Sequence, residues 1–476
     1  MIASGDILSF PIVPRHPLVG LAVVGFGASL APLDFAVNIA FPAITQAFTL
    51  ETSAIRWVAI SYVLTYASLM LAFGRLGDVI GHRHVFRAGL LTAVVAFVMC
   101  ALAPTYGWLL AARVVQGVSV ALVLSCAPAL AISLYDESRR TWALGAYAGT
   151  AAAAGVVAPL IGGISVAVLG WAGVFWFRAP IALLALLLLP LLPEAPRASQ
   201  SGSARSFDLA GAVLLAAGLA LLMLAPAIVQ SVSAAWHALA VAAAGIILFG
   251  VFVQRQRNAA APMLRRSVVR DVDFWLPNLA NFTVHVTSFA IPLVVPYYLT
   301  RIAGWGPMQS GLLMAVWATG ALAGSALAAR VVDALGVRPA TLAAGVLVAT
   351  GQLWIALWPD LPSLPVMLAS LLLQGAGLGL FQVAYTDIVV AALPRNDRGV
   401  AGSLTMLTRT IGIVLGAVWV TASMHAVEAR ELAAGAAPRE AFLAAFQTTF
   451  GLAAALAGAF FALTCLRRSA WFARRT

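Results

Sequence analysis

The 476-residue chain contains very little charge. Only 9% of its residues are charged and 62% are hydrophobic, with a mean hydropathy of +0.98, whereas a soluble domain has about 25% charged residues. So few charges cannot cover so much apolar surface, which excludes a soluble enzyme, a nucleic-acid binder and a disordered chain. The apolar runs are continuous rather than alternating, which excludes a β-barrel. The composition predicts an all-α integral membrane protein.

Lysine is missing altogether, because all 28 basic residues are arginine. A nucleotide-binding loop of the G-x-x-x-x-G-K-[ST] type needs a lysine, so an ATP-driven pump within this chain is excluded. Cysteine is scarce as well. Cys100, Cys126 and Cys465 lie in apolar stretches without paired spacing, which indicates neither a disulfide framework nor a metal site. We therefore expect no metal and no cofactor.

Long apolar runs are what the chain has in abundance. A membrane-spanning helix needs about 20 apolar residues, and fourteen such stretches fit the sequence. They are expected near residues 18–42, 55–73, 85–103, 107–134, 141–168, 170–192, 208–229, 235–254, 274–299, 307–332, 339–358, 363–392, 399–424 and 443–466.

The arginines orient these spans. With a cytoplasmic N-terminus, only Arg56, Arg301, Arg430 and Arg439 fall in outside segments, and Arg113, Arg178 and Arg409 fall within spans. Every other arginine lies in an inside segment, as the positive-inside rule requires. An odd number of spans would scramble this partition, so we expect both termini in the cytoplasm and a multi-pass protein of the plasma (inner) membrane. The net charge of +11 is then a topology signal and predicts no nucleic-acid partner.

The sequence repeats itself at an interval of about 256 residues. A D-x-x-G-x-R turn begins at Asp78 and again 255 residues later at Asp333, and the pair Gln116-Gly117 recurs 258 residues later as Gln374-Gly375. These matches predict two duplicated six-helix halves with two helices inserted between them. Parallel halves related by an axis along the membrane normal are typical of the major facilitator arrangement, with a substrate cavity between them near the midplane.

The predicted organisation is therefore an N-terminal six-helix half (1–192), a cytoplasmic linker (193–207), two inserted transmembrane helices (208–256) and a C-terminal six-helix half (257–476). The linker prediction rests on its richness in Pro, Ala and Ser.

Four motifs in chain order resemble those of the major facilitator superfamily, and specifically its fourteen-helix drug:proton antiporter branch of QacA/EmrB type. The motifs are Leu33-Asp34-Phe-Ala-Val37-Asn38-Ile-Ala40-Phe-Pro42, Gly74-Arg-Leu76-Gly-Asp78-Val-Ile-Gly81-His-Arg83, Arg113-Val-Val-Gln116-Gly117 and Gly155-Val-Val-Ala158-Pro159-Leu-Ile-Gly162-Gly163. The resemblance covers nearly the whole chain and implies a transporter rather than an enzyme. It also implies a role in proton transfer for the motif that contains Arg113.

Two residues depart from the pattern of this branch. Ala158 replaces the glycine that precedes the proline of the fifth-helix motif. Arg178 stands in Phe177-Arg178-Ala-Pro180, where the branch usually has an asparagine. The second change adds a charge to span six and could alter substrate preference.

Asp34 is the leading candidate for proton coupling. A carboxylate at membrane depth costs several kcal/mol unless it is paired, hydrated or protonated, so such a group can load and release a proton as its surroundings change. Arg113 lies at a similar depth in span four, either as a partner that tunes Asp34 or as half of a structural ion pair. Arg178 lies at similar depth in span six and could compete for Asp34 or face water. Asn38 is a further candidate, on weaker grounds, for the substrate cavity.

In the second half, Asp387 and Arg409 lie at similar depth in spans twelve and thirteen. A salt bridge between them is the leading interpretation, and a second proton or cation site is the alternative. His285, near the middle of span nine, is interpreted as a packing histidine rather than a proton relay. Tyr62, Trp317 and Tyr385 could form an aromatic wall for flat cations but are more typical of ordinary packing.

Two motifs predict conformational roles. The loop with Gly74, Asp78, Gly81 and Arg83 lies on the cytoplasmic face, where its charges would hold the halves in the outward-facing state. The group Gly155, Pro159, Gly162 and Gly163 has little side-chain bulk, which permits close helix approach and a seal against proton leak.

These observations predict proton-coupled efflux by alternating access. The expected substrates are small hydrophobic or cationic compounds such as drugs, dyes or antibiotics, and the partners are protons and the lipid bilayer. The alternative is an exporter of a single metabolite or antibiotic. The sequence leaves the substrate, the proton stoichiometry, the oligomeric state and any periplasmic adaptor open.

Overall fold

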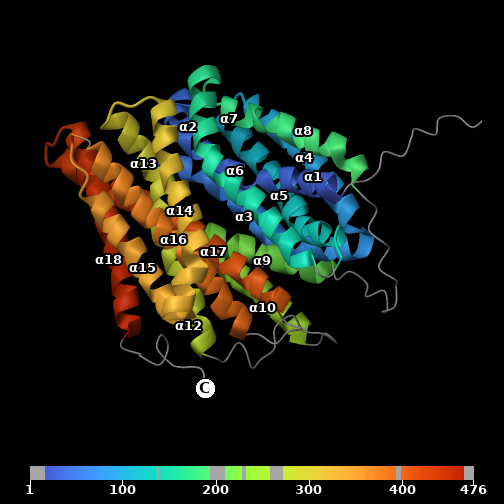
Figure 1. Cartoon of the computed structure of the whole chain (residues 1–476). Coiled ribbons are helices and arrows are strands. Elements are labelled where there is room, and N and C mark those ends of the chain that lie inside the picture. The colour runs from blue at the N-terminus through green and yellow to red at the C-terminus, as the bar shows by residue number, and fades with distance from the viewer. Residues whose placement is uncertain are drawn as a thin grey trace, which may run out of the picture.

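A computed structural model describes residues 17–136, 139–192, 209–227, 232–257, 272–361, 363–392 and 398–465. Within these ranges the chain is helical almost throughout (Figure 1). The linker predicted at residues 193–207 lies outside the described residues.

The N-terminal half consists of α1 (Pro17–Ser29), η1 (Pro32–Asp34), α2 (Phe35–Ala47), η2 (Thr52–Ile55), α3 (Arg56–Ile80), α4 (His82–Ala101), α5 (Tyr106–Ser133), α6 (Arg140–Leu169), α7 (Gly173–Trp176), α8 (Arg178–Leu188) and η4 (Leu189–Leu191). Two helices follow, α9 (Leu209–Ala227) and α10 (Val232–Arg257). The C-terminal half consists of α12 (Val272–Ser288), α13 (Ala290–Arg301), α14 (Pro307–Leu335), α15 (Val337–Ala356), α16 (Leu364–Ala392), α17 (Arg398–Ala433) and α18 (Pro438–Cys465).

Each of the fourteen predicted stretches contains helix where it is described. By length and composition, twelve of the described helices can cross a membrane, or thirteen if the bent helix over residues 52–80 counts as one span. The additional helix α9 is 19 residues long and apolar throughout but is not among these. The fold is therefore an all-helical membrane fold, and the count of fourteen spans stays a prediction.

The two halves repeat the same packing. In the N-terminal half α3 and α4 both pack on α5, and in the C-terminal half α14 and α15 both pack on α16. The glycine of the repeated Gln-Gly pair makes the same kind of close helix contact in both halves. Gly117 approaches the carbonyl oxygen of Tyr62 on α3, and Gly375 approaches the carbonyl oxygen of Trp317 on α14. Because a side chain at either glycine would meet backbone atoms, the small residue is required at both positions.

The repeated D-x-x-G-x-R turns also share one conformation. Gly81 joins α3 to α4 with φ 96°, and Gly336 joins α14 to α15 with φ 86°. Only glycine adopts this region at little cost, so each glycine allows one span to end and the next to begin without a loop. The internal repeat therefore extends from sequence to backbone geometry.

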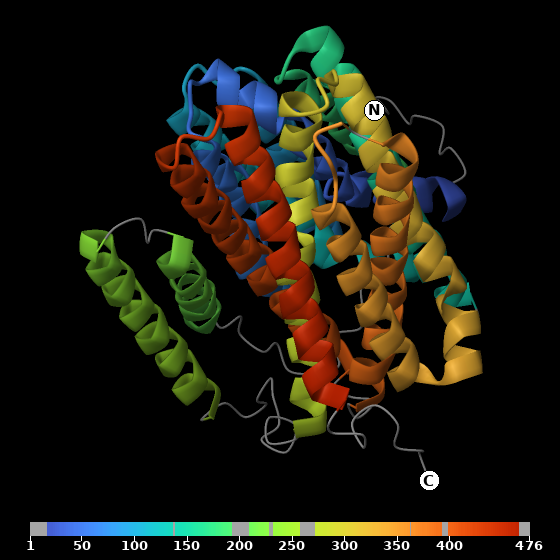
Figure 2. The same cartoon turned by 90° about the vertical axis from the view of Figure 1, so that its left-hand side faces the viewer.

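The inserted helices lie at the edge of the molecule. α9 and α10 pack on each other, and α9 also packs on α3 and α17. Figure 2 shows this hairpin in light green at the side of the two halves. The insertion therefore adds a hairpin to the outside of the bundle without separating the halves.

The halves are joined at one end. The largest buried apolar cluster contains residues of both halves, among them Val58 and Val294. Two smaller clusters, around Phe86 and around Val348, are each confined to one half. The joined end is the one that the arginine distribution assigns to the outside, and we call it the outer end.

Polar side chains link the halves at the outer end. Arg56 Nη1 donates to Thr421 Oγ1 at 3.1 Å, and Arg301 Nη2 donates to Thr52 Oγ1 at 2.8 Å. Thr45 and Tyr297 share a hydrogen bond between their hydroxyls. A cavity of about 330 Å³ lies beside these contacts, between the halves. Two of the four arginines predicted outside therefore join the halves, and we call Arg56 and Arg301 the outer latch.

Replacing both latch arginines by alanine is expected to open the outer end more often. A hydrogen bond from a charged group contributes about 1.5–3 kcal/mol, so the double variant should label a cysteine placed at Leu293 at least roughly tenfold faster. Leu293 lines the cavity and is 1% exposed. The measurement is the rate of maleimide labelling in a background without the three native cysteines.

Arg439→Ala is the matched control, because Arg439 donates to the carbonyl oxygens of Ile302 and Asp360 within its own half. It should leave the labelling rate unchanged. An unchanged rate in the double latch variant would show that these two arginines do not hold the outer end closed.

Candidate functional site

The regular α-helix of the first span is interrupted by a 3-10 turn at the position of its only carboxylate. α1 ends at Ser29, a 3-10 turn covers Pro32–Asp34, and α2 begins at Phe35 with Asp34 as its N-cap. Pro32 has no N–H to continue the α-helical hydrogen bonds, which explains why the regular helix stops here. The carboxylate thus lies at the N-terminus of α2, where the helix dipole favours a negative charge.

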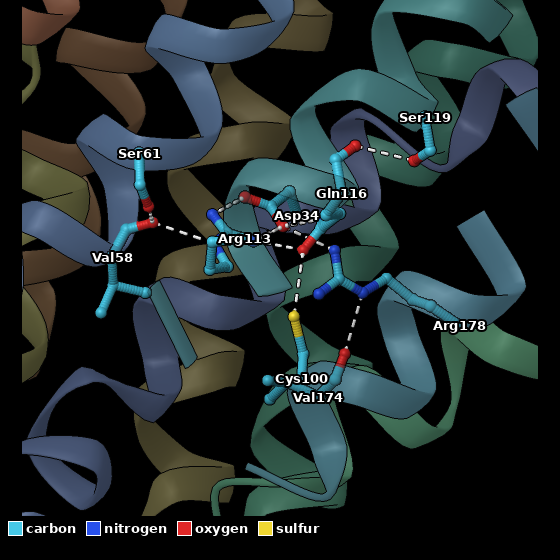
Figure 3. A network of polar contacts seen from close by, with 9 residues as sticks. All are labelled: Asp34, Val58, Ser61, Cys100, Arg113, Gln116, Ser119, Val174 and Arg178. Carbon is cyan, nitrogen blue, oxygen red and sulfur yellow. Dashed lines mark hydrogen bonds and ion pairs between the residues drawn. The ribbon is translucent and has the colours of Figure 1, made fainter. Parts of the chain in front are cut away.

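Three side chains donate hydrogen bonds to this carboxylate (Figure 3). Arg113 on α5 uses both terminal nitrogens, Nη1 to Oδ1 at 2.6 Å and Nη2 to Oδ2 at 2.8 Å. Arg178, at the start of α8, donates from Nη1 to Oδ1 at 2.6 Å. Gln116 Nε2 donates to the same Oδ1 at 2.9 Å. The predicted Asp34–Arg113 contact is therefore present, and of the two interpretations of Arg178 the structure shows the contact with Asp34.

The cluster carries an excess of positive charge. The side chain of Asp34 is 14% exposed, whereas those of Arg113 and Arg178 are 1% and 0% exposed. One carboxylate and two guanidinium groups give a net charge of +1. Buried charges are tolerated only when they are paired and hydrogen-bonded, so Asp34 supports both arginines in this conformation.

The arginines are held by different parts of the protein. Arg113 Nε donates to the carbonyl oxygen of Val58 at 2.9 Å, and its guanidinium lies 4.4 Å from the ring centre of Tyr62; both residues belong to α3. Arg178 Nε donates to the carbonyl oxygen of Val174 at 2.9 Å. Its guanidinium lies 4.7 Å from the ring centre of Phe97 and 5.2 Å from that of Phe175.

The C-terminal half contains an uncharged counterpart of this site. Its first span breaks between α12, which ends at Ser288, and α13, 254 residues after Asp34. Gln374 Nε2 donates to Ser288 Oγ at 2.9 Å, as Gln116 does to Asp34. Trp317 Nε1 donates to Gln374 Oε1 and its ring makes an edge contact with Phe35 in the other half.

The sequence does not predict this counterpart, and only the recurrence of Gln-Gly points to it. Gln116 likewise belongs to a sequence motif, but the sequence does not identify it as a partner of Asp34. Pro32, two residues before Asp34, is the sequence signal that could have indicated the break.

The remaining predicted site residues are dispersed. Asn38 is buried on α2 one turn beyond Asp34 and makes no side-chain hydrogen bond within the described residues. Asp387 is exposed near the end of α16, and among the described residues it forms no ion pair with Arg409. Arg409 instead lies within electrostatic range of Tyr66 and His285. The leading interpretation of a salt bridge between Asp387 and Arg409 is therefore not met in this conformation.

His285 and the three aromatic residues have local partners. His285 Nδ1 is 2.9 Å from the carbonyl oxygen of Asn281, one turn earlier, as expected of a packing histidine. Tyr62 lies against Arg113, Trp317 against Gln374, and Tyr385 donates to Asn278 Oδ1 at 2.9 Å. These different partners do not support one aromatic wall.

The loop that the sequence predicts to be cytoplasmic makes contacts within its own half. Asp78 Oδ1 lies 3.5 Å from His82 Nε2, and Arg83 Nη2 donates to the carbonyl oxygen of Leu189 at 3.3 Å. A Cβ on Gly74 would lie 3.9 Å from Ser125 Cβ on α5, which is an ordinary van der Waals contact. The predicted clamp in the outward-facing state concerns another conformation and stays a prediction.

The glycine motif on α6 packs against both halves. A Cβ on Gly162 would meet Ala36 of α2, two residues after Asp34, and a Cβ on Gly163 would meet Pro307 and Gly311 of α14 in the other half. The carbonyl oxygen of Pro159 also approaches Gly311, whereas Gly155 has only the Pro32 side chain within reach. The motif therefore connects the helix that carries Asp34 to the opposite half, as a seal requires.

Comparison with known proteins agrees with this architecture. The family model described as Major Facilitator Superfamily matches residues 18–417 and, in a second match, 277–470. The multidrug resistance protein Stp of Mycobacterium tuberculosis is 26% identical over 429 residues, which cover 86% of this chain and 78% of that protein. The puromycin resistance protein of Streptomyces alboniger is 30% identical over 409 residues, with coverage of 83% and 80%.

A solved structure shares the fold. The inward-facing, unoccupied bacterial homologue of the human lysosomal transporter Spinster superposes with a TM-score of 0.68 at 17% identity, covering 96% of this chain and 98% of that chain. The family match spans most of the residues, and the repeated packing of the two halves fits it. The chain therefore belongs to the Major Facilitator Superfamily and is a transporter, not an enzyme.

Proposed function

We propose that this protein is a proton-coupled antiporter that exports small hydrophobic or cationic compounds, such as drugs, dyes or antibiotics, across the plasma membrane. The observation that carries the proposal is the carboxylate of Asp34, placed at a 3-10 turn within the first span and held by two arginines. The relatives named for multidrug and puromycin resistance support export of small molecules.

The proposed cycle follows from the contacts of Asp34. With the orientation given by the arginine distribution, the described conformation is closed to the outside, and the two arginines stabilise the ionised carboxylate after its proton has left toward the cytoplasm. In the opposite conformation, loss of a contact with Arg113 allows a proton to bind from outside. Each inward transfer of one charge draws about 2.3 kcal/mol per 100 mV from the membrane potential.

The assignment to a branch of the superfamily and the orientation in the membrane follow from the sequence motifs and the arginine distribution. We place the chain in the fourteen-helix drug:proton antiporter branch, with both termini in the cytoplasm. In this assignment α9 is the fourteenth span, in addition to the thirteen helices that are long and apolar enough to cross a membrane. The predicted clamp by Asp78 and Arg83 then acts in the outward-facing state, when the cytoplasmic ends of the halves meet.

Transport by the purified protein in liposomes tests this function. A pH gradient, acidic on the side of the outer end, should drive movement of a fluorescent cation such as ethidium, or of another compound in a chemically varied panel. The gradient-collapsing ionophore nigericin is the control and should stop transport. Transport that is insensitive to both the gradient and the membrane potential would rule out proton coupling.

The alternative is an exporter of a single compound, as the name of the puromycin resistance relative suggests for that protein. Resistance profiles of a pump-deficient host separate the two. Protection against several unrelated dyes and antibiotics supports multidrug export, and protection against one compound supports the narrow exporter.

A further inference from the structure

The two arginines at Asp34 do not make equivalent contacts. Oδ1 accepts three hydrogen bonds, from Arg113 Nη1, Arg178 Nη1 and Gln116 Nε2, whereas Oδ2 accepts one, from Arg113 Nη2. A carboxylate oxygen that already accepts three donors has no lone pair left for a proton. Oδ2 is therefore the oxygen at which a proton can bind.

We propose that Arg178 is a positioning residue that stays on Oδ1 of Asp34 throughout transport, while Arg113 releases Oδ2 to let a proton bind there. The inference rests on the proposed function, because it assumes that Asp34 carries the coupled proton. It assigns a role to the residue at which this chain departs from the pattern of its branch.

The surroundings of Arg178 belong to the N-terminal half alone. Its contacts beyond Asp34 are Val174, Phe97 and Phe175, on α7 and α4, and its side chain is fully buried. The main packing partners of α4 and of α7 all lie in the N-terminal half, so motion of the halves past each other does not act directly on these contacts. Arg178 therefore keeps its position as the transporter changes conformation.

The surroundings of Arg113 belong to a helix at the interface between the halves. Val58 and Tyr62, which hold Arg113, lie on α3. Arg56, near the start of the same helix, donates to Thr421 on α17 in the other half. Because α3 packs along α17, a change in that packing reaches Arg113 through two direct contacts.

Proton binding at Oδ2 exchanges one hydrogen bond of Asp34 for a covalent O–H bond. An O–H bond forms between Oδ2 and a proton delivered by water, the hydrogen bond from Arg113 Nη2 is lost, and the carboxylate becomes neutral. Both guanidinium groups keep their protons, and Arg178 Nη1 continues to donate to Oδ1, now a carbonyl oxygen. On release the proton returns to water on the cytoplasmic side and Arg113 Nη2 binds Oδ2 again.

Few other ionisable groups face this site. Tyr62 and Tyr66 approach from α3 and Cys100 from α4. The helices α1 and α2, and the stretch of α6 from Gly155 to Gly162 that packs on η1 and α2, contain no titratable side chain. Arg113 and Arg178 are thus the charges that determine where Asp34 titrates.

Burial of Arg178 is energetically unfavourable in two respects. Its Nη2 is buried without a hydrogen-bond partner among the described residues, and its charge makes the cluster net positive. Arg178→Asn leaves the charge-balanced pair of Asp34 and Arg113, so we expect this variant to fold.

Infrared spectroscopy of the full-length protein in liposomes tests the proposal without a substrate. The carbonyl stretch of protonated Asp34 is identified as the band that titrates with pH and is absent in Asp34→Asn. In Arg178→Asn the midpoint of this band should move to higher pH by about 1–3 units, because a neighbouring cation that favours the ionised form is gone. The band should also move to higher frequency, because its carbonyl oxygen loses a donor.

Two further variants separate charge from structure. Arg178→Lys keeps the charge and should shift the midpoint by less than half as much, and it replaces Arg178→Asn as the test if that variant does not fold. Phe97→Leu alters the packing around Arg178 without changing charge and should leave the midpoint within about 0.3 units, well inside the natural spread of carboxyl values.

The outcomes distinguish this inference from the proposed function. If wild-type Asp34 never shows a titrating band while pH-driven transport occurs, proton-coupled transport stands but the proton binds at another residue, and the role of Arg178 is overturned together with the assignment of Asp34. If the band titrates but neither its midpoint nor its frequency changes in Arg178→Asn and Arg178→Lys, Asp34 still carries the proton and only the role of Arg178 is overturned.

Discussion

Asp34→Asn is expected to abolish transport driven by a pH gradient and to reduce the stability of the protein. Asparagine cannot bind and release the coupled proton. Its loss of charge also leaves Arg113 and Arg178 buried side by side, and removal of one partner from a buried ion pair costs about 3–5 kcal/mol. The measurements are initial rates of gradient-driven transport in liposomes and thermal unfolding in detergent.

A double variant provides the control for stability. Asp34→Asn alone raises the net charge of the cluster from +1 to +2, whereas Asp34→Asn combined with Arg178→Asn returns it to +1. The double variant should therefore unfold at a higher temperature than Asp34→Asn, yet remain inactive. Gradient-driven transport at the wild-type rate in Asp34→Asn would overturn the assignment of Asp34 as the proton carrier.

Gly163→Ala is expected to prevent normal closure of the outer end. A Cβ at this position would lie 3.1 Å from Met308 Cα and 3.2 Å from Gly311 Cα on α14, and closer still to the carbonyl oxygen of Pro307. These are backbone atoms, so the strain cannot be relieved by a side-chain rotation. Overpacking of this kind costs about 1–3 kcal/mol, which shifts the equilibrium between closed and open outer ends by roughly 5- to 150-fold.

The measurement is the labelling rate of the cysteine at Leu293, together with the rate of transport. Labelling should rise and transport should fall, because a transporter that cannot close its outer end cannot complete the cycle. Gly155→Ala is the matched control from the same motif, since a Cβ there meets only the Pro32 side chain at 3.8 Å. Equal effects of both substitutions would contradict a special role for the α6–α14 crossing.

Much of the fold could be predicted from composition and pattern. Each predicted apolar stretch contains helix where it is described, and twelve or thirteen of the described helices are long and apolar enough to cross a membrane, where only internally hydrogen-bonded helices satisfy the backbone. The repeats at Gly81 and Gly336, and at Gly117 and Gly375, correspond to repeated turns and repeated helix contacts. The requirement for glycine at such places is local, which is why a single sequence reveals it.

The candidate site could be predicted only in part. The rise of 1.5 Å per residue places Asp34 and Arg113 at one depth, and they are in contact. The same argument predicts a contact between Asp387 and Arg409, which the described residues do not make. Depth fixes the position along the helix axis, but contact also requires that two side chains face each other around their axes and that their helices are neighbours.

The pairing of the charges shows the same difference between what the sequence determines and what the tertiary structure determines. The sequence by itself determined that this is a helical membrane protein with duplicated halves, and that its rare intramembrane charges have to be paired. Only the tertiary structure decided which polar groups pair: it joined Arg178 to Asp34, brought Gln374 to Ser288 in the second half, and joined the halves through Arg56 and Arg301. The physical reason is that burial of a charge is a local property of the sequence, whereas its partner is chosen by the rotation and neighbours of each helix.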